Sequence, residues 1–347
     1  MAQNPHYYAI IMAGGEGKRF WPLSTRSYPK QFLDILGNGQ TLFQETYQRF
    51  KQICPEANIL VVTNEDYTGL IQEQVPEISD DQILPEPVGR NTAPAVAYGA
   101  FRIQVLDPDG TMVVAPSDHF ILNEDLFAQR IEEGMQTAAA SQSLITLGIH
   151  PTRADTGYGY IQMEDSAATE SLRRVKTFTE KPNKELAEYF LNSGEFLWNA
   201  GIFIWHTQTV LDSFQQYMPE LYESLKEGRS YFNTAQEPDF IREVYPTLPM
   251  TSVDYGIMEK AEQVYVLPAN FQWSDIGTWN SVFELLGKDE KNNALQGKQI
   301  FTRNAKDSLV QITPDKLVAL NNVDNLIVVD TGDCLLIADR NEEQEIR

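Results

Sequence analysis

Short, fully apolar runs alternate with amphipathic stretches through the first third of the chain. Three of these runs have the length and composition of strands buried on both faces: residues 8–13, 58–63 and 111–116. Helical spacing of apolar positions lies between or beside them, at residues 41–50, 65–74 and 93–105. Strands separated by helices predict right-handed crossover connections, and therefore an α/β fold with a mostly parallel sheet.

The middle of the chain mixes strand and helix patterns less regularly. Strand-like runs occur at residues 144–149, 159–163, 175–179 and 198–205. Helical patterns occur at residues 184–192 and 209–226. We expect these elements to complete one large domain that covers residues 1–286.

The last sixth of the chain has a different character. The polar stretch at residues 287–293 is typical of a linker. Closely spaced β-like runs follow it, at residues 299–302, 309–312, 316–320, 326–329 and 334–338. This spacing predicts a small C-terminal β domain over residues 287–347, with one or two coils of a β-helix as one possible form.

The charge of the chain limits its partners. With 49 acidic and 27 basic side chains, the net charge is -22. Nucleic acids and anionic membrane surfaces would be repelled, so we expect neither as a partner. An anionic small substrate would need a few basic residues placed locally, which draws attention to basic residues beside glycines.

The sequence also indicates where the protein resides. It has no apolar run long enough to span a membrane and no secretory signal pattern. Cys54 and Cys334 stand alone, as is typical of buried reduced thiols. We expect a cytoplasmic protein.

A glycine-rich loop directly follows the first apolar run. Gly14, Gly15 and Gly17 precede Lys18 and Arg19, a combination that suits close approach of an anion. The glycine spacing differs from that of a Walker loop, and Phe20 replaces the third glycine of a dinucleotide fingerprint. Taken alone, the loop is equally compatible with a glycine turn that carries exposed basic residues.

A lysine lies a short way after this loop in the sequence. Lys30 lies in a Pro-Lys-Gln-Phe stretch, residues 29–32, and a lysine behind a phosphate-binding turn can reach phosphates as a point charge. Most lysines are solvated, so this residue gains meaning only from its neighbours.

These motifs together resemble the signature of sugar-1-phosphate nucleotidyltransferases. The Trp-Pro-Leu-Ser stretch at residues 21–24 and the Pro-Lys-Gln-Phe stretch resemble the mannose-1-phosphate guanylyltransferase branch of that family. Further segments agree in order along the chain: residues 86–95, 116–119, 156–161, 180–182, 198–203, 252–259 and 273–279. The resemblance implies a Rossmann-like nucleotidyltransferase domain with a small C-terminal β domain, often as a homodimer.

Two aspartates are candidates for metal binding. Asp118 comes just after the third strand, where open α/β sheets place their ligand sites, and Asp275 lies in a Ser-Asp-Ile-Gly turn. An isolated aspartate more often caps a turn. The resemblance implies that both bind one Mg²⁺, with Mn²⁺ as an alternative, because an oxygen-only site completed by phosphate and water suits these ions.

The implied substrates are GTP and mannose 1-phosphate, and the implied reaction requires little proton chemistry. A sugar phosphate is largely a dianion at neutral pH and already a nucleophile. It would attack the α-phosphorus of GTP in line and expel pyrophosphate, so catalysis would consist of positioning and charge neutralisation. The resemblance places Lys18 and Arg19 near the β- and γ-phosphates, Lys30 near the attacked phosphate and Lys181 near the sugar phosphate.

Recognition of the base and the sugar is assigned by the same resemblance. The guanine-binding stretch corresponds to Glu86, Arg90 and Asn91, with backbone contacts from Ala13, Gly14 and Gly15. A carboxylate that accepts from guanine N1–H and N2–H₂ would reject adenine. The sugar-binding positions correspond to Gly157, Glu180, Asn199 and Gly201, and Asp254 is a weaker candidate for the same region.

Two alternatives remain open at this point. The first keeps the fold and changes the sugar phosphate or the base. The second is a regulatory relative that binds nucleotide sugar without turnover, although the aspartates and Arg19 that such a protein could lose are present. With only four histidines and a short stretch after residue 287, we expect no second, metal-dependent isomerase activity.

Overall fold

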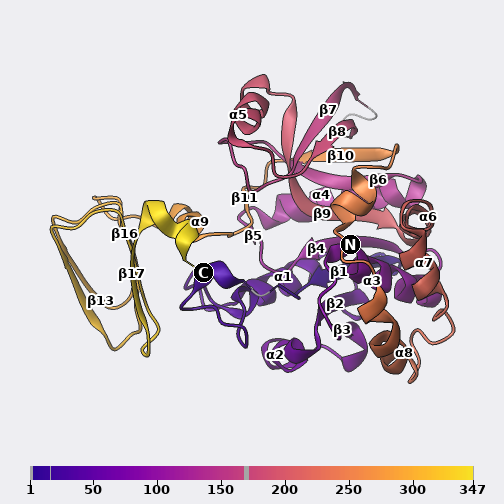
Figure 1. Cartoon of the computed structure of the whole chain (residues 1–347), viewed down its shortest axis with the longest axis horizontal. Helices are drawn as coiled ribbons and strands as arrows, with labels where there is room; N and C mark the ends of the chain where they lie inside the picture. Colours follow the sequence, from indigo (N-terminus) through magenta and orange to yellow (C-terminus); the bar gives the residue numbers. More distant parts are fainter. Residues whose placement is uncertain (1–2, 16, 168–171, 347) are drawn as a thin grey trace. The chain divides into compact units, whose positions relative to one another are not determined.

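The structure is a computed structural model that describes residues 3–15, 17–167 and 172–346 of the chain. It divides into two compact units (Figure 1). The first comprises residues 1–14, 46–117 and 121–273, and the second comprises residues 15–45, 118–120 and 274–347. Helix α1 (Leu42–Lys51) and the short strands β5 (Phe120–Ile121) and β11 (Trp273–Ser274) span points where the chain passes from one unit to the other.

The first unit is built on one large sheet. Within the described residues this sheet has nine strands in the order β3-β2-β1-β4-β9-β6-β10-β8-β7. The strands are β1 (Tyr7–Met12), β2 (Ile59–Asn64), β3 (Ile83–Glu86), β4 (Thr111–Pro116), β6 (Leu144–Ile149), β7 (Tyr160–Ala167), β8 (Arg173–Thr179), β9 (Phe196–His206) and β10 (Val264–Ala269). Strands β1 to β4 are parallel, with Ala9 paired to both Ile59 and Val113.

The other half of the sheet is mixed. Strand β9 runs antiparallel to β4, β6 and β7, and β8 runs antiparallel to β7 and β10. Among the described strands of this half, only β6 and β10 pair in parallel. The α/β fold class is confirmed, whereas the expectation of a mostly parallel sheet is wrong beyond the first four strands. A strand buried on both faces has the same apolar pattern in either direction, so the pattern could not show this.

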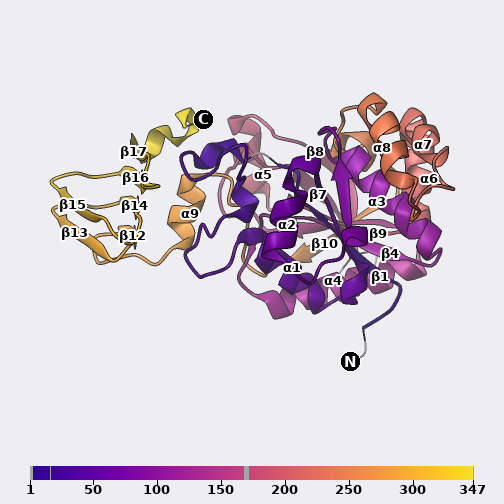
Figure 2. The same ribbon diagram turned by 90° about the horizontal axis from the view of Figure 1, so that it is seen from below.

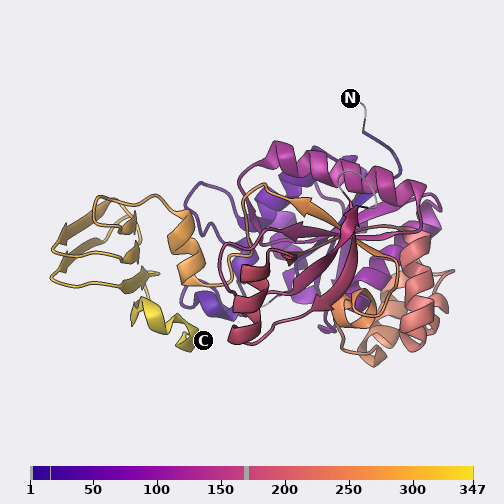
Figure 3. The same cartoon turned by 90° about the horizontal axis from the view of Figure 1, so that it is seen from above.

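Helices cover both faces of the sheet. Helices α3, α6, α7 and α8 lie on one side and α4 lies on the other (Figures 2 and 3). The helices of this unit beyond α1 are α2 (Thr68–Gln74), α3 (Thr92–Leu106), α4 (Glu124–Ala140), α5 (Lys184–Ser193), α6 (Thr207–Tyr217), α7 (Pro219–Lys226) and α8 (Glu237–Val244). Helix α3 is buried along nearly its whole length because it lies between β1 and helices α6 and α7, which explains its continuous apolar sequence.

The second unit ends in two stacks of parallel strands (Figure 2). After α9 (Trp279–Leu285) come β12 (Ala294–Gln296), β13 (Gln299–Arg303), β14 (Leu309–Gln311), β15 (Leu317–Asn321), β16 (Leu326–Asp330) and β17 (Leu335–Asp339). Leu309 pairs with Ala294 on one side and with Ile327 on the other, and β13 pairs with β15. This is the arrangement of a short β-helix, closed by the antiparallel strand β17.

Two apolar clusters stabilise this second unit. One fills the β-helix and includes Ala305, Val310 and Val328. The other joins Phe20 and Trp279 to β-helix residues that include Leu309, Ile327 and Val329. The segment at residues 15–45 therefore shares a core with the C-terminal strands, and the expected division into domains 1–286 and 287–347 stays a prediction.

Two expectations about the whole chain can be compared with the structure. No helix among the described residues is long and apolar enough to cross a membrane. Cys54 and Cys334 are free thiols; Cys54 is buried as expected, whereas Cys334 is only partly buried.

Candidate active site

The glycine-rich loop starts at the carboxyl end of β1 and is held by the two motifs that follow it. The side-chain amide of Gln31 donates to the Gly15 carbonyl at 2.9 Å, and the Ser24 hydroxyl donates to the Gly17 carbonyl at 2.6 Å. The C=O and N–H of one peptide unit point in opposite directions. The Lys18 N–H therefore points away from the Ser24 hydroxyl that donates to the Gly17 carbonyl. The Gln31 and Ser24 contacts thus give the two signature stretches a structural role.

Gly17 allows the loop to pass close to Lys30. Its φ is 57°, in the left-handed region, and a Cβ there would lie 2.6 Å from the Lys30 Cβ and 2.9 Å from the Lys30 backbone nitrogen. Any other residue would meet backbone atoms as well as an unfavourable φ. Glycine at this position is therefore required by the approach of residues 17 and 30.

Lys30 connects the two predicted metal-binding segments. Its ammonium group lies 2.9 Å from the Asp118 Oδ2 and donates to the carbonyls of Asp275 at 2.9 Å and Ile276 at 2.6 Å. The side chain is 9% exposed. An ammonium group has three donors, and these three contacts use all of them. Lys30 thus holds the Asp118 and Asp275 segments together within the second unit.

The aspartates themselves suit a partial metal site. Burial raises the pKa of Asp118, but the charges of Lys30 and His119 and the bond from Lys30 outweigh it, so the pKa lies below its ordinary value. Asp275 Oδ1 accepts from the Gly277 N–H at 3.1 Å. No group of three or more Asp, Glu, His or Cys side chains with metal-binding geometry occurs in the described part of the chain. Two carboxylates fit an ion that takes most of its ligands from phosphate and water, such as Mg²⁺.

The turn that carries Asp275 has an unusual backbone. Ile276 has a φ of 42°, which is rare for a β-branched residue, and its side chain is fully buried beside Phe20 and Trp279. Strained backbone of this kind persists where surrounding contacts fix it and is frequent at functional sites. Here the strain directs the Ile276 carbonyl to Lys30.

Arg19 remains available for an anion. Its side chain is exposed and forms no ion pair or hydrogen bond with another residue that the structure describes. Residues Lys18–Phe20 form a 3₁₀ helix. The side chain of Lys18 lies outside the described part of the structure, so its predicted role stays a prediction.

Glu86, at the end of β3, lies against the first glycine of the loop. A Cβ on Gly14 would be 2.9 Å from the Glu86 Oε2, and Gly14 itself is exposed. The other oxygen, Oε1, accepts a hydrogen bond of 2.5 Å from the Tyr245 hydroxyl. Burial raises the pKa of Glu86 to about 7, although the Tyr245 bond opposes this shift. Ala13 is fixed nearby in the sheet, where its N–H donates to the Val62 carbonyl at 2.8 Å.

Arg90 and Asn91 form the turn between β3 and α3. Arg90 donates from Nη2 to the Pro246 carbonyl, and its Nε is buried without a hydrogen-bond partner among the described residues. Asn91 caps α3, with a φ of 68° and its side chain accepting from the Thr92 N–H at 2.8 Å. Both residues thus shape the segment that follows Glu86.

The predicted sugar-binding residues gather at the start of β7 and on β9. Glu180 pairs with Lys181 at 3.2 Å, and Lys181 has a φ of 48°. A Cβ on Gly159 would lie 2.3 Å from the Glu180 Oε2 and 3.3 Å from the Asn199 Cβ. The structure therefore brings Gly159, rather than the predicted Gly157, against Glu180 and Asn199; the Gly157 N–H instead donates to Asp155 at 2.8 Å.

Asn199 organises this cluster. Its amide donates to the Asp254 Oδ1 at 2.8 Å, and its own oxygen accepts from the Gly201 N–H at 3.1 Å. Burial, with a further contribution from the charge of Glu180, raises the pKa of Asp254 to about 6. Asp254, which the sequence indicated only weakly, therefore belongs beside Asn199 and Glu180.

The predicted residues thus fall into groups by unit. Gly15, Gly17, Arg19, Lys30, Asp118 and Asp275 belong to the second unit, and the other base candidates and the sugar candidates belong to the first. The residues that sequence reasoning missed are Gly159 and Tyr245. The Thr-Gly-Tyr-Gly stretch held a signal for Gly159, whereas Tyr245 has no motif around it.

Comparison with known proteins defines the class to which this architecture belongs. The nucleotidyl transferase family model matches residues 8–292, so the chain belongs to this family. Within it, the chain is similar to mannose-1-phosphate guanylyltransferases. The Escherichia coli protein is 36% identical over 359 residues, covering 100% of this chain and 73% of its own length. The Klebsiella pneumoniae protein is 36% identical over 347 residues, covering 97% and 72%.

A solved structure agrees with these sequence relatives. It is described as a mannose-1-phosphate geranyltransferase from Thermus thermophilus and is 29% identical to this chain. The match has a TM-score of 0.87 and covers 98% of this chain and 97% of that one. The likeness therefore extends through the C-terminal β-helix.

Proposed function

We propose that the protein transfers GMP from GTP to mannose 1-phosphate, forming GDP-mannose and pyrophosphate. The observation that carries this proposal is the contact set of Lys30, which links the Asp118 and Asp275 segments in the same compact unit as the glycine loop. The sequence relatives supply the substrates: they match nearly the whole chain and bear the name of this activity.

The reaction needs charge neutralisation more than proton transfer. The sugar phosphate, largely a dianion at neutral pH, attacks the α-phosphorus in line, and the bond to the pyrophosphate leaving group breaks. Arg19 and Lys18 neutralise the β- and γ-phosphates, and Lys181 attracts the sugar phosphate. Lys30 fixes the two carboxylate segments, because its three donors are already committed to them.

Asp118 and Asp275 would hold a divalent cation, with Mg²⁺ favoured and Mn²⁺ possible on the same oxygen ligands. When bound, the ion supplies positive charge to the phosphate oxygens and lowers the cost of crowding them. The low pKa of Asp118 supports this assignment because the carboxylate is ionised at neutral pH.

The residues assigned to the base and the sugar would recognise the organic parts of the substrates. Glu86 accepts from guanine N1–H and N2–H₂ beside Gly14, with Arg90 and Asn91 shaping the adjoining turn. Glu180, Asn199 and the glycines near them accept and donate to sugar hydroxyls. A homodimer and a cytoplasmic location stay predictions from the resemblance and the composition.

The test compares two aspartates that each accept from a lysine. Asp118→Asn removes a proposed metal ligand, and Asp330→Asn removes a carboxylate on β16 that pairs with Lys316. We expect Asp118→Asn to lose at least about 100-fold in turnover, as is usual when a charge-stabilising group is removed. Asp330→Asn should keep turnover, and circular dichroism should show both variants folded. An active, folded Asp118→Asn protein would contradict the metal assignment.

A further inference from the structure

A segment that mostly precedes the signature stretch at residues 252–259 fixes the residues proposed to read the base. The segment at residues 245–253 contacts the segment at residues 86–93 at four points. The Tyr245 hydroxyl donates to Glu86, and Arg90 donates to the Pro246 carbonyl. The Val253 N–H donates to the Thr92 hydroxyl at 2.9 Å, and the Ala93 N–H donates to the Thr251 carbonyl at 3.1 Å.

One oxygen of the Glu86 carboxylate is held by a hydrogen bond, and the other faces Gly14. Oε1 accepts the 2.5 Å hydrogen bond from the Tyr245 hydroxyl. Oε2 lies 2.9 Å from the position that a Cβ on Gly14 would occupy. The residue is 7% exposed, so it has little freedom to turn. Since Oε2 lies beside the exposed Gly14, the Tyr245 bond leaves that oxygen as the one presented at the loop.

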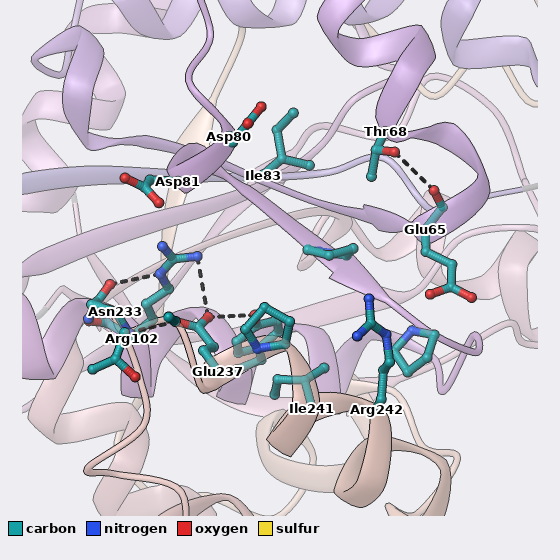
Figure 4. A pocket seen from close by; sticks show the side chains of 16 residues that line it. Glu65, Thr68, Asp80, Asp81, Ile83, Arg102, Asn233, Glu237, Ile241 and Arg242 are labelled. Carbon is teal, nitrogen blue, oxygen red and sulfur yellow. Dashed lines mark hydrogen bonds and ion pairs between the residues drawn. The ribbon is translucent and has the colours of Figure 1, made fainter.

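Tyr245 is fixed by a second buried network. Its ring is fully buried and packs edge to face against Tyr98, with the ring centroids 6.3 Å apart. The Tyr98 hydroxyl donates to Glu237 at 2.6 Å, and Glu237 pairs with Arg102 at 3.3 Å. Figure 4 shows Arg102, Glu237 and Asn233 joined on one wall of a pocket of about 690 Å³.

We propose that Tyr245 is a positioning residue for base selection: its hydrogen bond to Oε1 aims the Glu86 carboxylate. This inference rests on the proposed function, because it assigns Glu86 to guanine. A neutral carboxyl has one acceptor fewer for the N1–H and N2–H₂ pair, so ionisation and orientation both matter. No residue between 245 and 251 falls within the signature motifs, which leaves this contact unassigned by them.

The titration of Glu86 supports a pH-dependent readout. Burial raises its pKa to about 7, and Tyr245 is the group that lowers it. Around it, β2 contributes the neutral Asn64 as its register partner, and Tyr98 on α3 lies behind Tyr245. The Glu237–Arg102 pair lies beyond Tyr98. Loss of the Tyr245 hydroxyl should therefore move the pKa of Glu86 further upward.

The experiment measures kcat and KM for GTP from about pH 6 to about pH 8.5, where the guanine base stays neutral. For wild type, kcat/KM should rise with a midpoint near 7 as Glu86 ionises. For Tyr245→Phe the midpoint should shift upward, so the deficit is greatest near neutral pH and shrinks at higher pH. The loss should appear in KM and not in kcat.

Two further variants make the result specific. Tyr98→Phe keeps the ring that packs against Tyr245 and removes only a buried hydroxyl that bonds Glu237 rather than Glu86, so it should follow the wild-type profile. Glu86→Gln cannot ionise, so adding Tyr245→Phe to it should produce no further change in the profile. A Tyr245→Phe profile that runs parallel to wild type at every pH would overturn the inference.

Calorimetric binding of GTP over the same range separates the two proposals. If Tyr245→Phe binds GTP with the expected upward shift in pH dependence relative to wild type but wild type releases no pyrophosphate, the proposed reaction fails and the role of Tyr245 stands. If GTP is turned over but Tyr245→Phe binds it with the wild-type pH dependence, the role of Tyr245 fails and the reaction stands.

Discussion

Lys30 shows how a single side chain acquires its role from its partners. Its sequence position suggested direct contact with the attacked phosphate, yet its three donors reach Asp118 and two backbone carbonyls. The presence and importance of Lys30 could be predicted from the signature, because lysine behind a glycine loop is part of that pattern. Its bonding could not, because residues 30, 118 and 276 are brought together only by the fold.

The stability of the protein should depend on this lysine. Lys30→Met leaves Asp118 charged and poorly compensated, so we expect a loss of about 2–4 kcal/mol in the free energy of unfolding at pH 7. Lys30 lowers the pKa of Asp118 in the folded protein. Its contribution to the free energy of unfolding is therefore present at pH values above the ordinary pKa of aspartate, and it is lost as the pH falls through the lowered pKa. The deficit should therefore shrink in acid.

Urea denaturation at neutral and at acidic pH measures this difference. Lys226→Met removes an exposed lysine that pairs with Glu223 and should cost less than about 1 kcal/mol. Equal stability of Lys30→Met and wild type at pH 7 would show that the pairing with Asp118 does not stabilise the fold.

Several elements of the first half of the chain could be predicted from its hydrophobic pattern, whereas β3 and α4 were not predicted. The apolar runs near residues 8–13, 58–63 and 111–116 correspond to β1, β2 and β4, and the glycine loop follows β1 directly. The antiparallel direction of β9 could not be read, because a strand with both faces buried is apolar throughout. Tyr245 was equally hidden, since a buried aromatic residue is ordinarily part of a core.

The glycine loop allows a controlled test at the scale of an element. Gly17 and Gly39 both have positive φ, but their surroundings differ: a Cβ on Gly17 would lie within 3 Å of the backbone of another segment, whereas a Cβ on Gly39 would meet nothing within 4 Å. Both alanine variants should lose about 1 kcal/mol from backbone strain. Gly17→Ala should also displace Lys30 and sharply reduce turnover.

Thermal unfolding and turnover of the two variants, measured side by side, check this expectation. Gly39→Ala should be as active as wild type. If Gly17→Ala keeps full activity while it loses no more stability than Gly39→Ala, the close approach of the loop to Lys30 does not contribute to turnover.

At the scale of the whole molecule, the C-terminal β-helix shares an apolar core with the segment that follows the glycine loop. The predicted β runs at residues 299–338 correspond closely to strands β13 to β17, because their spacing reflects stacked coils. Their shared core with Phe20 and Ile276 was not predictable, since the sequence pattern shows which residues are buried but not against what. The Lys30 Nζ lies over the Phe20 ring, 5.6 Å from the ring centroid, and so links this core to the aspartates.

Two equivalent valines test that link. Val329 and Val310 are both fully buried, but Val329 belongs to the cluster with Phe20 and Ile276 and Val310 belongs to the cluster inside the β-helix. Each alanine variant should lose about 1–3 kcal/mol. Only Val329→Ala should lower kcat at a temperature where both remain folded; equal kcat for the two variants would mean that the shared core does not support catalysis.

The central claim is that this chain makes GDP-mannose, and the most direct measurement is pyrophosphate release with mannose 1-phosphate, Mg²⁺ and each of GTP, ATP, UTP and dTTP in parallel. We predict rapid release with GTP alone, dependent on both the sugar phosphate and the metal ion. Release with another nucleotide would keep the chemistry and contradict the role given to Glu86. No release with any nucleotide, from a folded sample, would contradict the proposed reaction itself.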